Sequence, residues 1–495
     1  MTSERLSILR SLIERRRGRP LAIAHRGASA YATENSLGAF RKAHSLGADL
    51  WWVDTALSQD GTCVACHNEK PHRLDGKNSQ HDRLDTNKIL NSRKLNGDTL
   101  PSFADVVSQA KYFGAGIYVN INHHEDGFAS WREMRRQGFR TALLGSQNPQ
   151  HLRSLRQAGC DYPLAIMVRE GIDPLLQAKE ASTEIIHLEW QMAGAKPREL
   201  ITDGFFDRAA DVGLEVVLWN DKRQEVLREL LQLPVLGICS DQPELLVPLP
   251  KSKHSSLKVV CHRGAENLAP ENTLSAVNLA FNQGFDIVEV DVQQTKDGVP
   301  VIIHDTRVNR TTNGQGKIRN LSYAEVAELD AGSWFDPFFE GEPVPQLEDV
   351  LLLARERGGL YLEIKEAEVE ILLELVQRLD MLQDCFFWCK DNRTMDQLRS
   401  MNSEARLMVR RCDFDSLETA IERHNPNVVE FDGLKFTQKE LELCRSLGIL
   451  SMSFHMSSSI EVIERLAGSG LDMLNLRHPE LLKKMMINPE HFTST

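Results

Sequence analysis

The chain repeats itself with an offset of 237 residues, and this repeat constrains the fold more than any other feature of the sequence. His25-Arg26-Gly27 recurs as His262-Arg263-Gly264, and a second histidine follows each motif at the same spacing of 42 residues, at His67 and His304. A chain of 495 residues is also too long for one ordinary domain. The repeat therefore predicts two related domains of about 250 residues each.

The boundary between the two domains is predicted from a proline-containing polar stretch. Pro248 and Pro250 interrupt regular structure, and the residues up to Ser256 are mostly polar. We therefore expect a first domain at residues 1–250 and a second at 257–495. Within the second, residues 305–345 lack a strong strand pattern and are predicted to form an insertion that caps a binding site.

Short β-branched runs alternate with amphipathic helical patterns along the second half. This alternation predicts an α/β fold made of two tandem (β/α)8 TIM barrels, because the first half follows the same order. The second half offers nine strand candidates for eight places: 258–262, 286–293, 300–304, 360–365, 385–388, 407–409, 428–431, 449–454 and 473–475. The first four strand places of the first half are assigned to 22–25, 50–56, 62–67 and 116–121.

Composition argues against some classes of binding partner. The net charge of −12 argues against a nucleic-acid-binding protein, which usually presents a basic face. The sequence has no apolar run near 18 residues and no secretory signal, and its nine cysteines suit a reducing compartment. We therefore expect a cytoplasmic protein without a transmembrane segment, acting on a small molecule, and a homodimer is considered.

An amphipathic basic helix is predicted near the N-terminus, between Arg5 and Arg19. Such a helix can bind an anionic membrane surface or cover the bottom of the first barrel, and the second interpretation is favoured.

Polar and charged residues are expected to gather at the mouth of the second barrel, where the strands end. Side chains two apart on a strand share a face, and catalytic groups of TIM barrels lie at the carboxyl ends of the strands. Burying so many charges without partners would be costly, so they indicate a functional site. Four adjacent predicted strands supply six such residues: His262, Glu289, Asp291, His304, Glu363 and Lys365.

The residue types at this mouth point to phosphodiester cleavage. The three carboxylates of Glu289, Asp291 and Glu363 form an oxygen site for one hard divalent cation, Mg²⁺ or Ca²⁺. Arg263 and Lys365 can hold phosphate oxygens. The two histidines can share proton transfer, one as base and one as acid, in either assignment.

The second half resembles the glycerophosphodiester phosphodiesterase family. The motifs that carry the resemblance are His262-Arg263-Gly264, Pro270-Glu271-Asn272-Thr273, Glu289-Val290-Asp291-Val292, Lys296-Asp297-Gly298-Val299-Pro300, His304-Asp305, Arg310-Thr311-Thr312 and Glu363-Ile364-Lys365. The resemblance implies a TIM barrel and metal-dependent hydrolysis of glycerophosphodiesters to glycerol 3-phosphate and an alcohol. It also implies His262 and His304 as acid and base, the three carboxylates as metal ligands, and a cyclic phosphate intermediate that water opens.

The chain departs from the family pattern at two positions. Phe454-His455 stands where family members often have Trp-Thr, and Lys390 stands where a serine is common. Both positions lie where the alcohol would bind, so Phe454 and Lys390 are candidates for substrate binding. Two rival interpretations remain: an enzyme of the same scaffold acting on lysophospholipids, and a non-catalytic protein that binds a phosphodiester. Glu271-Asn272 is interpreted as a structural start of a helix.

The first half has lost most of these charges. Trp52 takes the place of Glu289, Asn120 that of Glu363 and Asn122 that of Lys365. Asp54 alone is a weak metal site, so the first barrel is predicted to be non-catalytic.

Two alternatives are weighed for the histidines of the first half. His25 and His67 with His123 or His124 could bind a softer metal such as zinc. The segment Cys63 to His67 also matches a c-type haem attachment pattern, which its place on a predicted strand disfavours.

Overall fold

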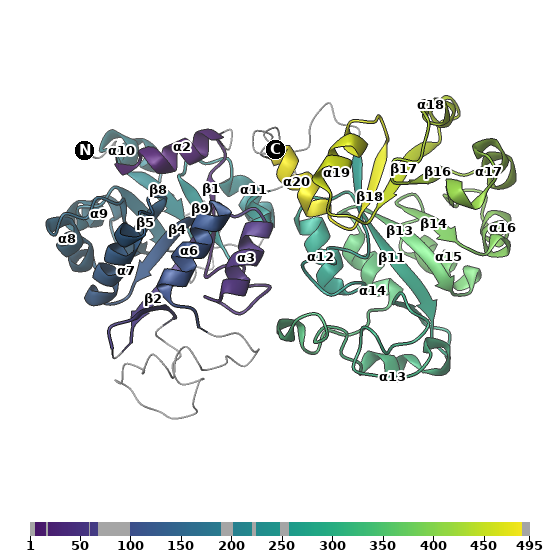
Figure 1. Cartoon of the computed structure of the whole chain (residues 1–495), viewed down its shortest axis with the longest axis horizontal. Helices are drawn as coiled ribbons and strands as arrows, with labels where there is room; N and C mark the ends of the chain where they lie inside the picture. The colour runs from purple at the N-terminus through teal and green to yellow at the C-terminus, as the bar shows by residue number, and fades with distance from the viewer. Residues whose placement is uncertain are drawn as a thin grey trace. The chain divides into compact units, whose positions relative to one another are not determined.

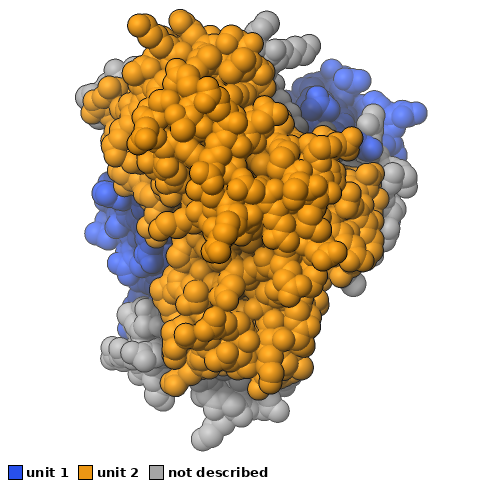
Figure 2. Space-filling model, turned by 90° about the vertical axis from the view of Figure 1, so that its right-hand side faces the viewer, with its two compact units in different colours: residues 1–247 blue, residues 248–495 orange. Residues whose placement is uncertain are grey.

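The computed structural model describes residues 5–15, 18–58, 60–67, 100–189, 201–219, 224–247 and 257–487. The chain divides into two compact units, residues 1–247 and 248–495 (Figure 2). The predicted linker from Pro248 to Ser256 lies outside the described residues. Each unit contains one parallel barrel surrounded by helices (Figure 1).

The first barrel has eight parallel strands and is closed by pairing between its first two strands. In order around the barrel the strands are β1 (Leu21–Ala24), β2 (Leu50–Leu57), β4 (Gly116–Ile121), β5 (Ala142–Ser146), β6 (Leu164–Arg169), β7 (Ile185–Glu189), β8 (Glu215–Leu218) and β9 (Gly237–Ser240). The outer helices are α3 (Leu37–Ser45), α6 (Phe103–Phe113), α7 (His124–Arg136), α8 (Pro149–Gln157), α9 (Pro174–Ala181), α10 (Phe205–Asp211) and α11 (Gln224–Leu230).

The second barrel has the same architecture. A parallel bridge between Phe387 and Leu407 completes the ring of strands. Its strands are β10 (Lys258–Cys261), β11 (Ile287–Gln294), β13 (Gly359–Glu366), β14 (Cys385–Cys389), β15 (Met408–Arg410), β16 (Val428–Asp432), β17 (Leu450–His455) and β18 (Met473–Leu476). Its helices are α12 (Leu274–Asn282), α14 (Leu347–Ala354), α15 (Val369–Arg378), α16 (Asn392–Met401), α17 (Leu417–His424), α18 (Gln438–Ser446), α19 (Ile460–Ala467) and α20 (Pro479–Ile487). The prediction of two tandem (β/α)8 barrels is confirmed.

The ninth strand candidate lies outside the barrel. β12 (Pro300–Ile302) pairs antiparallel with β11, so the prediction that His304 ends a barrel strand is wrong. The physical reason is the short connection: β11 ends at Gln294, and a parallel crossover needs a dozen or more residues. A turn containing Gly298, at φ +86°, joins the two strands as a hairpin. β3 (Cys63–Ala65) forms the same antiparallel hairpin with β2 in the first barrel, so the assignment of residues 62–67 to a barrel strand is also wrong.

The insertion after β12 folds as a small subdomain on this hairpin. It contains η3 (Ile318–Asn320), α13 (Tyr323–Ala327) and η4 (Pro337–Phe339). Its buried apolar side chains form a separate cluster with those of the hairpin: Val301, Ile303, Val308, Ile318, Val326, Ala331 and Val344. The insertion therefore has its own core, and His304 stands at its junction with the hairpin.

The predicted N-terminal helix is α2 (Ser7–Arg15), and it covers the first barrel. Leu6, Leu9 and Leu12 are buried in the same cluster as Leu21 and Leu50, which begin β1 and β2. The apolar face of α2 thus packs on the amino-terminal end of the barrel, as the barrel-cap interpretation predicts. Among the residues that the structure describes, no helix has the length and apolar character needed to cross a bilayer.

Candidate active site

Three carboxylates converge at the mouth of the second barrel. Glu289 and Asp291 lie on β11, and Glu363 lies beside Asp291 on the adjacent strand β13. One oxygen from each falls within 4.8 Å of the others, and no other group of three potential ligands in the described residues meets this criterion. Buried Glu289 Oε1 accepts no hydrogen bond, and buried Asp291 Oδ1 lies in an ion pair with Lys365. Oxygen ligands of this kind fit a hard divalent cation.

The charges of the three carboxylates also favour the binding of a cation. Burial, and then the neighbouring charge of Asp291, raises the pKa of Glu289 well above its usual range. Burial would also raise the pKa of Asp291, but Lys365 and Arg263 hold it below its usual value. Lys365 Nζ lies 3.1 Å from Asp291 Oδ1 and pairs with Glu363 as well. A bound divalent cation would offset the repulsion between these carboxylates.

The loop after β10 holds the carboxylates in place. Arg263 adopts a left-handed φ of +52°, and its backbone N–H donates to Glu289 Oε2 at 2.7 Å. Its guanidinium Nε lies 3.1 Å from Asp291 Oδ2. Asn272, at φ +57°, donates from Nδ2 to the same oxygen at 2.7 Å. Two strained backbone positions therefore orient the metal-binding candidates.

His262 follows β10 and faces the carboxylates. Its Nδ1 lies 2.7 Å from Glu266 Oε1, and its Nε2 lies 4.0 Å from Glu289 Oε2. The Phe454 ring, on β17, lies 5.3 Å from the imidazole centroid. Because Nδ1–H donates to Glu266, the ring directs Nε2 towards the site as the atom that exchanges a proton.

His304 is held in a similar way by residues of the insertion. Its Nδ1 lies 2.7 Å from Asp305 Oδ1, and its carbonyl accepts from Gln293 Nε2 at 3.0 Å. Hydrogen bonding, chiefly from Arg310, lowers the pKa of Asp305 to about 2. Asp305 is therefore ionised at neutral pH and keeps the imidazole Nδ1 protonated.

Arg310 connects the insertion to the barrel loop. It binds Asp305 at 2.8 Å and Glu271 at 2.9 and 2.8 Å. Glu271 also binds Arg263 at 3.0 Å, so one chain of ion pairs runs from the insertion to the residue after His262. Glu271 pairs with arginines and is absent from the carboxylate cluster. α12 begins just after this segment, as the helix-start interpretation predicts, with Thr273 as its N-cap.

The candidates for alcohol binding differ in placement. Phe454 lies against His262, as described above. Lys390 follows the end of β14 and is exposed, so its role stays a prediction. Trp388, two residues earlier, is buried among the barrel interior residues, and Arg410 lies over its ring at 5.4 Å.

A second buried polar group lies in this barrel and was not predicted. Glu430 on β16 accepts from Asn475 Nδ2 at 3.2 Å and lies 3.6 Å from Arg410 Nε. Burial raises the pKa of Glu430 to about 7, although Asn475 and Arg410 oppose this effect. Because side chains alternate along a strand, the sequence could have placed Glu430 in the barrel interior. A carboxylate is notable there, since interior barrel positions are usually aliphatic.

The positioning roles of the residues that support the site were not predicted, although Asp305, Arg310 and Asn272 stand in the motifs that carry the family resemblance. Glu266, Asp305 and Arg310 each fix a predicted residue but have no chemical role of their own that composition could indicate. Asn272 could have been found from the repeat: Asn35 stands in the same place, also at φ +57°, and binds Asp54.

In the described part of the first barrel, protein groups already occupy the ligand atoms of the remaining carboxylate, Asp54. Asp54 Oδ1 accepts from Trp52 Nε1 at 3.0 Å and from Asn120 Nδ2 at 2.7 Å. Asp54 Oδ2 lies 2.7 Å from Arg26 Nε and 3.2 Å from His67 Nδ1. Both oxygens that a metal would need are thus satisfied by protein groups.

Aromatic side chains fill the barrel interior next to Asp54. The ring of Trp52 is buried, 4.5 Å from Tyr118 and 4.9 Å from Trp219. The zinc alternative is wrong for the described residues, because no metal-ligand group forms there. His123 instead caps α7, and His124 packs on Phe128.

Comparison with known proteins assigns both barrels to one family. The model of the glycerophosphoryl diester phosphodiesterase family matches residues 25–245 and 262–443. A glycerophosphodiester phosphodiesterase of Caldanaerobacter subterraneus is 44% identical over 112 residues, which are 22% of this chain and 46% of that protein. One from Bacillus subtilis is 38% identical over 117 residues, or 22% of this chain and 40% of that protein. The chain thus spans about half the length of the curated relatives it matches.

A solved structure was matched as well. The crystal structure of a glycerophosphodiester phosphodiesterase from Agrobacterium tumefaciens is 34% identical, with a TM-score of 0.45, and the match covers 46% of this chain and 99% of that one. The family model covers most of both barrels. The chain therefore belongs to the glycerophosphoryl diester phosphodiesterase family, with one family domain in each barrel.

Proposed function

We propose that the second barrel hydrolyses glycerophosphodiesters to glycerol 3-phosphate and an alcohol, using one divalent cation, Mg²⁺ or Ca²⁺. The observation that carries the proposal is the group of three converging carboxylates, in which buried Glu289 Oε1 accepts no hydrogen bond. This group faces His262 and lies beside the hairpin that carries His304. Membership of the family supports the substrate class.

Glu289, Asp291 and Glu363 would hold the cation. The cation would supply positive charge to offset the charge that develops on the phosphate during displacement. Arg263 and Lys365 lie beside these carboxylates and add positive charge where the phosphate oxygens would bind.

The two histidines move the protons. Each has its Nδ1 held by a carboxylate, Glu266 for His262 and Asp305 for His304. Nε2 is therefore the reactive atom on each ring. One removes the proton from the attacking hydroxyl, the other protonates the leaving alkoxide, and the roles reverse when water opens a cyclic phosphate. The first barrel takes no part in this chemistry, because its Asp54 is fully engaged.

A matched pair of variants tests this proposal in the full chain. Purified protein with Mg²⁺ or Ca²⁺ is incubated with sn-glycero-3-phosphocholine, and released glycerol 3-phosphate is measured. His262→Ala should reduce turnover by about a hundredfold or more, whereas His25→Ala, at the same place in the first barrel, should leave turnover nearly unchanged. EDTA should abolish activity, and added cation should restore it.

The substrate is then varied at its alcohol. Ethanolamine and inositol headgroups, and a lysophospholipid, are compared with choline under the same conditions. Absence of glycerol 3-phosphate release from every glycerophosphodiester, with either cation, would contradict the proposal. If only the lysophospholipid is cleaved, the proposed substrate class would be wrong, but the proposed metal site would still stand.

A further inference from the structure

The mouth of the first barrel keeps an open cavity although the catalytic charges are gone. The cavity has a volume of about 440 Å³ and lies at the carboxyl ends of the strands. Trp52 and Trp219 contribute aromatic rings to it, and its rim carries several amides, including Asn122 and Gln147. TIM barrels bind their ligands at this end.

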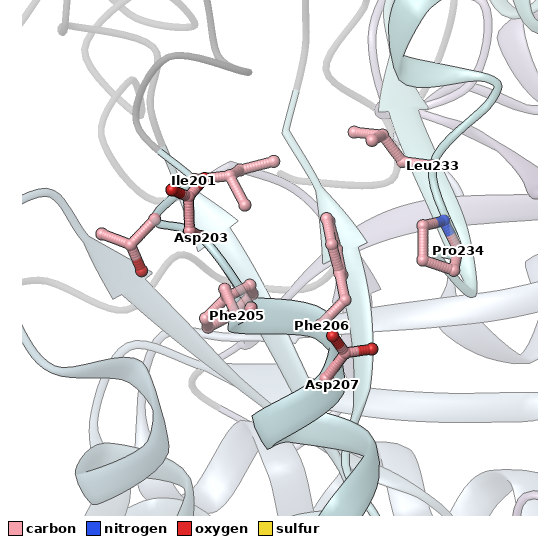
Figure 3. A pocket seen from close by; sticks show the side chains of 9 residues that line it. Ile201, Asp203, Phe205, Phe206, Asp207, Leu233 and Pro234 are labelled. Atoms are coloured by element: carbon pink, nitrogen blue, oxygen red, sulfur yellow. The ribbon is translucent and has the colours of Figure 1, made fainter.

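Three buried polar atoms of lining residues have no hydrogen-bond partner: His25 Nε2, Asn122 Nδ2 and Trp219 Nε1. His25 and Trp219 are each only 7% exposed. Such atoms are costly to leave unpaired, so they indicate a bound polar group. Another hollow of this barrel, of about 370 Å³ between Asp203 and Pro234 (Figure 3), has no such atom among its described lining residues.

The unpaired atoms select the chemistry of the ligand. His25 Nδ1 lies 2.7 Å from Asp241 Oδ1, and with a proton on Nδ1 the ring offers Nε2 as an acceptor. Asn122 Nδ2 and Trp219 Nε1 are donors. One acceptor and two donors match hydroxyl groups, which both donate and accept.

The charges around the cavity argue against an anion or a cation as the ligand. Arg26 is neutralised by Asp54 at 2.7 Å and by Glu34 at 2.7 Å. Arg169 at the rim lies 3.9 Å from Glu189. The cationic groups therefore already have carboxylate partners, and a neutral ligand fits this balance.

We propose that the first barrel binds a neutral polyol of the size of a hexose or an inositol, without cleaving it. The hydroxyls pair with His25 Nε2, Asn122 Nδ2 and Trp219 Nε1. The volume is within the range of small-molecule sites. This site is separate from the proposed hydrolytic site.

Calorimetric titration of the full chain tests the proposal. The probes are myo-inositol, glucose and glycerol, with sn-glycerol 3-phosphate and inorganic phosphate as charged comparisons, all in EDTA to remove cations from the second barrel. We expect saturable binding of at least one neutral polyol. Asn122→Ala and Trp219→Phe should each weaken it about tenfold, because each removes one donor. Trp219→Phe retains an aromatic ring, so it separates the lost donor from lost packing.

Lys365→Ala is the matched control, because Lys365 holds the place of Asn122 in the second barrel. It should leave polyol binding unchanged, while Asn122→Ala should leave phosphodiester hydrolysis unchanged. Binding that survives both first-barrel substitutions, or that Lys365→Ala removes, would overturn the proposal. So would an absence of binding by all three polyols, or tighter binding of phosphate that is sensitive to Asn122→Ala. None of these outcomes depends on whether the second barrel is an active enzyme.

Discussion

Asn272 binds Asp291 through both the side chain and the backbone. Its Nδ2 donates to Asp291 Oδ2 at 2.7 Å, and its Oδ1 accepts from the Asp291 N–H at 3.1 Å. Asn272→Ala removes both bonds and leaves a buried carboxylate less well oriented. We expect the cation affinity, measured from the cation dependence of turnover and by direct metal titration, to fall about 10–100-fold.

The chain supplies a control for this substitution. Asn35 makes the same two bonds to Asp54 in the first barrel, at 3.2 and 3.1 Å. Asn35→Ala should therefore leave the cation dependence of turnover unchanged. Equal effects of the two substitutions, or none from Asn272→Ala, would contradict the assignment of Asp291 as a ligand.

Trp52 stabilises the first barrel in place of a metal site. Its side chain is 1% exposed, and its indole N–H donates to Asp54. Trp52→Ala should lower the free energy of unfolding of the first barrel by about 3–5 kcal/mol, because it leaves a cavity and an unsatisfied carboxylate. Chemical denaturation measures this change. Tyr112, which is 84% exposed, provides a control, and Tyr112→Ala should change stability little. If Trp52→Ala lowers the free energy of unfolding as little as Tyr112→Ala does, Trp52 does not stabilise the core.

Gly264 permits the close packing of the His262 loop on α12. Its φ is +80°, and a Cβ there would meet the Ala276 carbonyl carbon at 2.7 Å. Gly264→Ala should therefore displace Arg263 from Glu289 and lower both stability and turnover.

Gly298 provides a control. It has a similar φ of +86°, but the nearest atom to its Cβ would be 3.8 Å away. Gly298→Ala should cost only about 1 kcal/mol of backbone strain in a denaturation experiment. Turnover in Gly264→Ala equal to that in Gly298→Ala would contradict the proposed role of close packing.

Glu430 should make the stability of the second barrel depend on pH. Its folded pKa of about 7 lies above the usual value of 4.5, so the folded state holds a proton that the unfolded state releases. The contribution of Glu430 to stability is therefore fully present below about pH 4.5 and is lost as the pH rises through 7, by up to about 3 kcal/mol. Glu430→Gln replaces the titrating carboxyl group with an amide. The free energy of unfolding of this variant, measured with denaturant, should therefore vary less between pH 5 and 8. Identical pH profiles of the two proteins would contradict a protonated Glu430.

The repeat made most of the fold predictable from sequence. Strand positions and the two barrels followed from the alternation of apolar runs and helical patterns, and the metal-site candidates followed from carboxylates two residues apart on a strand. The misassigned strand at residues 300–304 shows the limit of this approach. Apolar content alone cannot distinguish a barrel strand from a hairpin strand, but the length of the connection can.

The supporting residues were harder to predict for a different reason. Glu266 acts four residues after His262, while the corresponding partner of His25 is Asp241, which comes from the far end of the first domain. Their positions depend on loop geometry and not on periodicity. A comparison of the two copies that searched for shared asparagines would have found Asn35 and Asn272.

The hairpin formed by β11 and β12 divides the proposed catalytic pair between two separate structural units. His262 belongs to the barrel wall, whereas His304 is carried by a hairpin whose apolar residues pack with the insertion. The stability of the insertion therefore sets how firmly one of the two histidines is held, while the three carboxylates lie on barrel strands β11 and β13. Changes in the insertion core can thus alter the position of His304 while the barrel strands still carry the three carboxylates, so the two parts of the proposed site can vary separately.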